Sequence, residues 1–262
     1  MGYAVRMSLM WVLLVVATVG GVSAVADANA NAIAVKVVLF PFRHAVVSAR
    51  VDSFVKQYGL REGEAFRKDA LIVQLEEDNY LQMFLRAKSS WEEKKSLLRF
   101  SATNCERNED LFKKGVLGNK ELETGKLEKE SAEAQLQFAA ANMEIAKLQL
   151  DACRITAPFN GRLSKKVVQD YEYVRAGQPM IEIIDDEQLL AVMYLPSSLR
   201  KSIDRNMELK VRIDETGTVH FGKIYEISAQ IDPRSRTFEV KVLLDNHARK
   251  LTAGMAGVLL NH

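Results

Sequence analysis

The stretch from Asp78 to Ala152 constrains the fold most, because it has the pattern of two long helices around a short connection, Gly115-Val-Leu-Gly118. Its second half, from Glu121, contains no proline and one glycine, and it is rich in strong helix formers. Small and apolar residues recur there in alternating steps of four and three, which is a heptad pattern. These positions are Leu127, Ser131, Ala134, Phe138, Ala141, Ile145, Leu148 and Ala152.

The first half carries a heptad pattern of its own in Phe84, Trp91, Leu98, Cys105 and Phe112. Two such helices predict an antiparallel coiled-coil hairpin over residues 78–153. We expect residue 84 opposite 152, 91 opposite 145, 98 opposite 138, 105 opposite 131 and 112 opposite 124. The predicted hairpin core therefore consists of Phe84, Trp91, Leu98, Phe112, Leu127, Ala134, Phe138, Ile145 and Leu148. Arms of about 33 residues would reach about 50 Å.

Two β-rich segments flank this hairpin and repeat each other. Residues 46–77 align with residues 154–186 without a gap at an offset of 108 residues, with apolar and turn positions coinciding. Each segment is too short to close a core alone, so we expect two halves of one domain that the hairpin interrupts. Gly161 and Gly177 are predicted turn residues that need special backbone angles.

The remaining β-rich segment spans residues 187–260. Four short runs of alternating apolar and polar residues are separated by turn residues, which predicts a small antiparallel β-barrel. One or two helical turns are expected between Pro196 and Ile203, and Gly254 is expected in a turn. Residues 27–45 are predicted to form an N-terminal linker and a strand. Together, the helical hairpin and the separate β-rich segments predict an α+β fold.

The N-terminus, residues 1–26, has the pattern of an export signal. Arg6 precedes an apolar run from Met7 to Val19, and Ala24-Val-Ala26 matches a small-x-small cleavage site. Extended through Val25, the same run is long enough for a retained membrane anchor, so a cleaved signal peptide and an anchor both remain open. Either alternative predicts an exported protein.

Composition and spacing exclude several functional classes. The 36 basic and 34 acidic residues are nearly balanced, which argues against a nucleic-acid partner. Cys105 and Cys153 have no metal-binding spacing, and no histidine has a His or Cys partner four residues away, so no metal site is expected. The chain also lacks a nucleophile elbow, an HExxH motif and a P-loop. We therefore predict neither an enzyme nor a cofactor.

Three stretches resemble a known family, the periplasmic adaptor (membrane fusion) proteins of the HlyD and resistance-nodulation-division (RND) type. Residues 155–163 with 174–180 resemble the second lipoyl-like half motif of these adaptors. Phe221-Gly-Lys-Ile224 and the segment 231–237 resemble the barrel signature. Asp245-Asn246 and Leu251-Thr-Ala-Gly-Met255 resemble the segment that closes the barrel.

The resemblance implies a coiled-coil hairpin inserted in a lipoyl-like (barrel-sandwich hybrid) domain and followed by a β-barrel. It implies that the protein links an inner-membrane transporter to an outer-membrane channel for the export of small molecules. It also implies self-association into a ring and a location in the periplasm at the inner membrane. The class of transporter (RND, ABC or MFS) is left open, because the chain has little sequence on either side of the barrel for a membrane-proximal domain.

The hairpin tip is the implied contact with the channel. Adaptors that dock on an outer-membrane export duct share an Arg-x3-Leu-x6-Ser pattern, which Arg107 and Leu111 match, whereas Gly118 stands at the serine position. The resemblance thus assigns the tip contact to Arg107, Leu111, Gly115 and Gly118.

Two other functions compete with this one. A lipoyl or biotinyl carrier needs an exposed lysine where the two halves meet, and residues 75–79 contain none. A structural tether between envelope layers would need the same hairpin without transport, and this alternative remains open.

Overall fold

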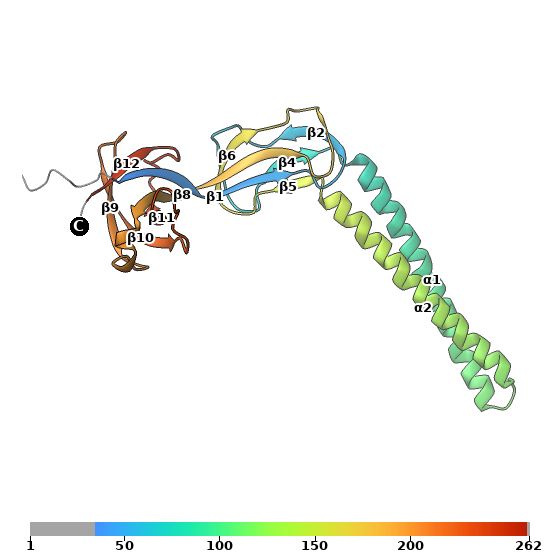
Figure 1. Ribbon diagram of the computed structural model, residues 1–262. Helices are drawn as coiled ribbons and strands as arrows, with labels where there is room; N and C mark the ends of the chain where they lie inside the picture. The colour runs from blue at the N-terminus through green and yellow to red at the C-terminus, as the bar shows by residue number, and fades with distance from the viewer. Residues whose placement is uncertain (1–34, 261–262) are drawn as a thin grey trace, which may run out of the picture. The chain divides into compact units, whose positions relative to one another are not determined.

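The structure, a computed structural model, describes residues 35–260 (Figure 1). The predicted signal peptide or anchor, residues 1–26, and residues 27–34 of the predicted linker lie outside the described residues. Within the described part, no helix is both long and apolar enough to cross a membrane.

Two long antiparallel strands, β1 (Lys36–Ser48) and β8 (Pro179–Pro196), run through both β-rich regions. At one end they join β9 (Glu208–Ile213), β10 (Val219–Ile227), β11 (Thr237–Asp245) and β12 (Ala256–Leu260) in the order β1-β12-β9-β10-β11-β8. Because β1 also pairs with β8, these six strands close into a barrel. The domain boundary predicted from the sequence, between residues 186 and 187, lies inside β8, where no turn interrupts the strand.

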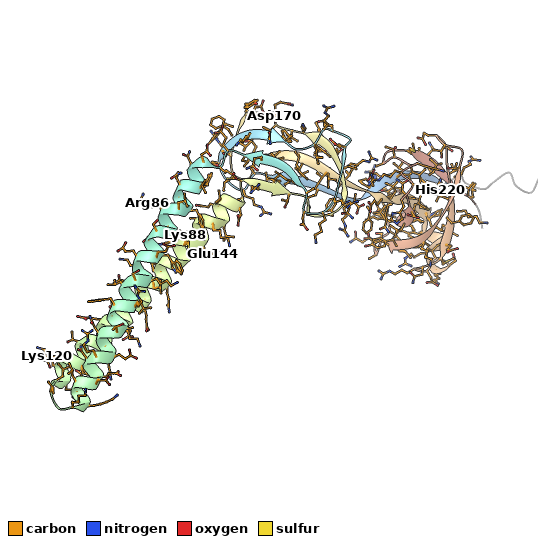
Figure 2. All side chains as sticks on the ribbon, turned by 180° about the vertical axis from the view of Figure 1, so that it is seen from behind. Arg86, Lys88, Lys120, Glu144, Asp170 and His220 are labelled. Carbon is orange, nitrogen blue, oxygen red and sulfur yellow. The ribbon has the colours of Figure 1, made fainter. Side chains whose placement is uncertain are left out.

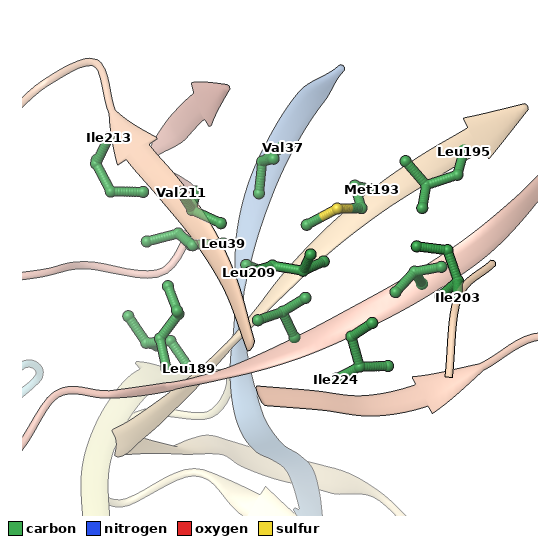
Figure 3. Packing of buried hydrophobic residues seen from close by; sticks show 14 of the residues in the cluster. Val37, Leu39, Leu189, Met193, Leu195, Ile203, Leu209, Val211, Ile213 and Ile224 are labelled. Atoms are coloured by element: carbon green, nitrogen blue, oxygen red, sulfur yellow. The ribbon is translucent and has the colours of Figure 1, made fainter. Parts of the chain in front are cut away.

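The barrel core is built by alternation, since every second side chain of each strand points inward. In β11 the buried residues are Phe238, Val240, Val242 and Leu244. Figure 3 shows inward side chains from β1, β8, β9 and β10 meeting in this core. All four predicted runs are strands, and the predicted helical turn is a 3-10 helix, η1 (Ser197–Lys201).

The two halves of the other β region follow the 108-residue repeat. β2 (Ser53–Tyr58) and β3 (Ala65–Phe66) correspond, with the same bounds plus 108, to β6 (Gly161–Lys166) and β7 (Tyr173–Val174). β4 (Leu71–Leu75) corresponds in the same way to the start of β8, and the end of β1 corresponds to β5 (Arg154–Thr156). Equivalent side chains are buried together in one core, such as Val55 with Leu163 and Leu75 with Ile183. The predicted repeat is confirmed.

The three singled-out glycines serve two different purposes. Gly177 and Gly254 lie in turns with φ of +88° and +97°, a region that residues with a Cβ rarely adopt. Gly161 does not have a positive φ, so the predicted need for special angles is wrong there. It begins strand β6, where a Cβ would collide with the carbonyl oxygen of Ile184 on the paired strand. Close approach of two backbones therefore requires this glycine.

The helices α1 (Asp78–Lys113) and α2 (Asn119–Asp151) leave and re-enter the β region between β4 and β5. These two strands pair, with Val73 opposite Ile155 and Gln74 opposite Arg154, so the two ends of the helix pair start from neighbouring strands. Figure 1 shows α1 and α2 running side by side.

The face of α2 that packs against α1 differs from the predicted one. Leu127, Phe138, Ile145 and Leu148 are exposed, with Phe138 at 71%, and so is Ala134. The inward positions lie two residues earlier in the heptad and are buried or half-buried: Leu122, Gly125, Lys129, Ala132, Leu136, Ala139, Met143, Ala146 and Leu150. Assigning Leu127, Ala134, Phe138, Ile145 and Leu148 to the hairpin core is therefore wrong.

The physical reason is that small residues on α2 let the two helices approach closely. On α1, Phe84, Trp91 and Leu98 are half-buried, and Ser101 and Cys105 are buried. The buried positions of α2 include Gly125, Ala132, Ala139 and Ala146, which allow that close approach. The exposed Leu127, Phe138, Ile145 and Leu148 lie on the other side of α2, because two residues turn a helix by about 200°.

The predicted register is wrong as well. In that register Asn108 opposes Glu128, whereas a Cβ on Gly125 would lie 2.9 Å from Nδ2 of Asn108, so the helices are shifted by three residues. Phe112, predicted to oppose residue 124 in the core, is 41% exposed near the end of α1. Lys88, which lies between Phe84 and Trp91 on α1 and is labelled in Figure 2, is exposed.

Both cysteines are buried free thiols. Burial raises the pKa of Cys153 to about 11, and the Glu77 carboxylate adds to the shift. Because the thiolate is the reactive form, we expect the Cys105→Ala variant to react with a disulfide reagent at pH 8 about a hundredfold more slowly when folded than in urea. The rate of absorbance change measures this, and equal rates would show that Cys153 is accessible and ordinary in its pKa.

Candidate functional site: the connection between the helices and the outer face of α2

The end of α1 is a well-formed helix stop. Gly115 has φ of +71°, its N–H donates to the carbonyl of Phe112 at 2.9 Å, and the N–H of Val116 donates to Leu111 at 3.0 Å. This pair of bonds is the Schellman motif, which satisfies the last carbonyl groups of a helix and fixes the direction of the chain that follows. The connection at residues 114–118 is therefore held in place by its own backbone.

Gly118 is the N-cap residue of α2. Its backbone is extended, with φ of −77° and ψ of 161°, and its carbonyl accepts the N–H of Leu122 at 3.3 Å. A serine at this position would offer a hydroxyl to the free N–H groups of the first turn, which glycine cannot do. A Cβ there would meet only the carboxylate of Glu121, a flexible group. Glycine in place of the serine of the family pattern therefore means that α2 begins without a capping side chain at Gly118.

The residues that the sequence assigned to the tip all lie at this end of the helix pair. Arg107 is exposed on α1, and Leu111 is half-buried one turn further on. Val116, which the sequence did not single out, is 72% exposed at the centre of the connection. Its position directly after Gly115, in the short connection between the two helices, is the sequence signal that would have identified it. Arg107, Leu111 and Val116 offer a partner one cation beside two apolar side chains.

The outer face of α2 is the second candidate surface. It consists of the exposed residues Leu127, Ala134, Phe138, Ile145 and Leu148, and we call it the outer seam. These residues keep a heptad spacing although they are exposed. A helix with apolar heptads on two opposite sides is typical of one that packs between two other helices. The outer seam is therefore a surface suited to another helix.

A buried polar cluster connects the barrel with the repeat domain around β8. Asn246 donates from Nδ2 to the carbonyls of Asp186 at 2.8 Å and Leu251 at 2.9 Å, and its Oδ1 accepts the N–H of Leu251 at 3.0 Å. Asp186 also accepts from Nε of Arg162 at 2.6 Å. This network explains the Asn and Leu of the barrel-closing segment as structural residues. In residues 35–260, no group of three or more His, Cys, Asp or Glu side chains is placed to hold a metal ion.

The fold thus combines a closed six-stranded barrel with a repeat domain that a long helix pair interrupts, and the far end of this helix pair is exposed. A family model described as CusB-like, beta-barrel domain matches residues 191–260. The multidrug resistance protein MdtA of Yersinia pestis (strain Pestoides F) is 25% identical over 213 residues, which cover 76% of this chain and 48% of the relative. The chain thus spans about half the length of the curated relatives it matches.

Solved structures share the fold. The membrane fusion protein Spr0693 from Streptococcus pneumoniae R6 superposes with a TM-score of 0.68 at 12% identity, covering 87% of this chain and 97% of that one. MacA from Actinobacillus actinomycetemcomitans gives a TM-score of 0.58 at 14% identity, covering 87% and 78%. In sequence and in fold, the chain is thus similar to the membrane fusion, or periplasmic adaptor, proteins of the RND type.

Proposed function

We propose that this protein is a non-enzymatic periplasmic adaptor that links an inner-membrane transporter to an outer-membrane channel for the export of small molecules. In this proposal, residues 78–153 are a coiled-coil hairpin inserted between the two halves, 46–77 and 154–186, of a lipoyl-like domain. Residues 187–260 are the β-barrel domain, and the protein acts at the periplasmic face of the inner membrane. The observation that carries the proposal is the tip, where Val116 is exposed next to a helix stop and near the half-buried Leu111.

The tip is the proposed channel contact. Arg107, Leu111 and the Gly115–Gly118 connection lie at the end of the helix pair that is far from the β-strands along the chain. A helix of 36 residues such as α1 carries this end about 54 Å from its start. That reach suits a protein that must contact partners in two membranes.

Crosslinking from two places tests the proposal directly. A photoreactive amino acid at Val116 should capture an outer-membrane channel protein in intact cells, and one at exposed Phe221 in the barrel should capture an inner-membrane transporter. Mass spectrometry of the adducts identifies both partners. Capture of outer-membrane protein from Val116 with no transporter at any exposed barrel position would instead support the tethering alternative.

Self-association into a ring is the second part of the proposal, and the outer seam supports it. Replacing Phe138 and Ile145 together with aspartate should abolish self-association, because two charges would enter the helix–helix contact. Sedimentation velocity across a concentration series measures the effect.

The matched control for this variant replaces Arg86 and Ser89 with aspartate, because both are exposed on α1 outside the outer seam. The control should associate like the unmodified chain. Equal association of the two double variants would exclude the outer seam as the contact.

A further inference from the structure

The outer surface of the barrel has a groove that the proposed function does not use. It lies where β1, β8 and β11 are neighbours, with Val38 opposite Val192 and Phe40 opposite Leu190. Leu39 and Met193 point into the core (Figure 3), so the residues beside them point outward. The groove has a volume of about 490 Å³, which is within the range of small-molecule sites.

The floor of this groove is apolar although it faces solvent. Val38 is 40% exposed and Phe40 is 49% exposed, while Leu190 and Val192 are half-buried between them. The four side chains are contiguous across two paired strands, unlike the single exposed apolar residues that are ordinary on protein surfaces. Covering them with an apolar ligand would be favourable.

The charges that line the groove, Lys36, Glu239 and Lys241, are unequally satisfied. Glu239 accepts a hydrogen bond from the Tyr194 hydroxyl at 3.1 Å and pairs with Nζ of Lys241 at 3.5 Å. Lys241 is held in addition by Glu226 at 3.0 Å, which raises its pKa. Lys36 is exposed and lines the groove together with Tyr194, and it has no ion pair within residues 35–260. Lys36 is thus the cation that remains for a ligand.

We propose that this groove binds a small anionic amphiphile, with its hydrocarbon or aromatic body on the floor and its carboxylate or sulfonate at Lys36. The groove extends along β1 from Lys36 to Phe40, a distance of about 13 Å, because a strand rises about 3.3 Å per residue. A chain of about ten carbon atoms fits that length. The inference goes beyond the proposed linking function and does not depend on it.

The charge pattern favours a single small molecule over a membrane surface. Anionic membranes are held by clusters of lysine and arginine residues, each contributing modestly. Here Lys36 acts alone, because Lys241 is already neutralised by Glu226 and Glu239. One cation beside an apolar floor matches one anionic head group.

Isothermal titration of the full chain with decanoate, below the concentration at which it forms micelles, tests the inference. We expect one site per chain and at least tenfold weaker binding of decyltrimethylammonium, which has the same chain and the opposite charge. Lys36→Gln should weaken decanoate binding at least tenfold. Lys210→Gln, which alters another exposed lysine beside an exposed aromatic ring (Phe221, 5.4 Å), should leave it unchanged.

A second variant checks the floor. Val38→Asp should abolish decanoate binding without unfolding the chain, because Val38 is exposed and the aspartate repels the ligand's charge. Three results would overturn the inference: equal binding of the two amphiphiles, equal effects of Lys36→Gln and Lys210→Gln, or binding to phosphatidylglycerol vesicles with none to decanoate. The last result would identify a membrane-contact face instead.

Discussion

Export should fail when Leu111 is replaced by aspartate, although the protein should remain folded. Leu111 is half-buried at the exposed end of α1, and only its carbonyl takes part in the helix stop. The new charge costs folding about 0.5 kcal/mol because it lies near a helix C-terminus. In the proposed contact the same charge would be buried without a partner, which is far more costly. Substrate accumulation in cells that depend on this adaptor measures the result.

A matched control separates loss of contact from loss of fold. Leu85→Asp places the same charge at an exposed leucine of α1, 26 positions before Leu111 and about 39 Å away along the helix. This variant should export normally. If Leu111→Asp also exports normally, or if the two variants fail equally, the tip is not the channel contact.

The second large effect should distinguish the two faces of α2. Ala132 is 3% exposed and faces α1, whereas Ala134 is exposed on the outer seam. Ala132→Asp should lower the free energy of unfolding by about 3 kcal/mol, because it buries an unpaired charge. Ala134→Asp makes the same chemical change, so both share the small loss of helix propensity, about 0.6 kcal/mol.

Urea unfolding followed by far-ultraviolet circular dichroism compares the two variants at low protein concentration, where self-association does not contribute. The packing in the structure predicts that Ala132→Asp unfolds at a much lower urea concentration than Ala134→Asp. If Ala134→Asp unfolds at the lower urea concentration instead, the hairpin core predicted from the sequence is correct.

The β-strands could be predicted from the sequence because alternation is a local signal. Thr237 to Val242 alternates strictly, and β11 extends this run by three residues. The 108-residue repeat was equally visible, since a repeated unit keeps its apolar and turn positions wherever it lies in the chain. What alternation does not reveal is continuity: β8 passes from one domain into the next without a turn, so the domain limit could not be located.

The helix pair shows where a periodic pattern becomes ambiguous. On α2, both the outer seam and the buried face, with Gly125, Ala132, Ala139 and Ala146, keep heptad spacing. Choosing the larger side chains was reasonable for a helix with one partner, but it selected the outer seam. Gly161 is a similar case, because a glycine reserved for backbone contact has the same sequence signature as one reserved for a turn.

The order of elements, the repeat, the strands and the helices were thus settled by the residues alone, because each depends on neighbours in the chain. The face of α2 that contacts α1, the three-residue shift between the helices and the groove beside Lys36 were decided only in the folded chain. Those features depend on how side chains from distant segments fit together. Gly125, Ala132, Ala139 and Ala146 let the two helices approach closely, and that choice of face is made by volume rather than by hydrophobicity.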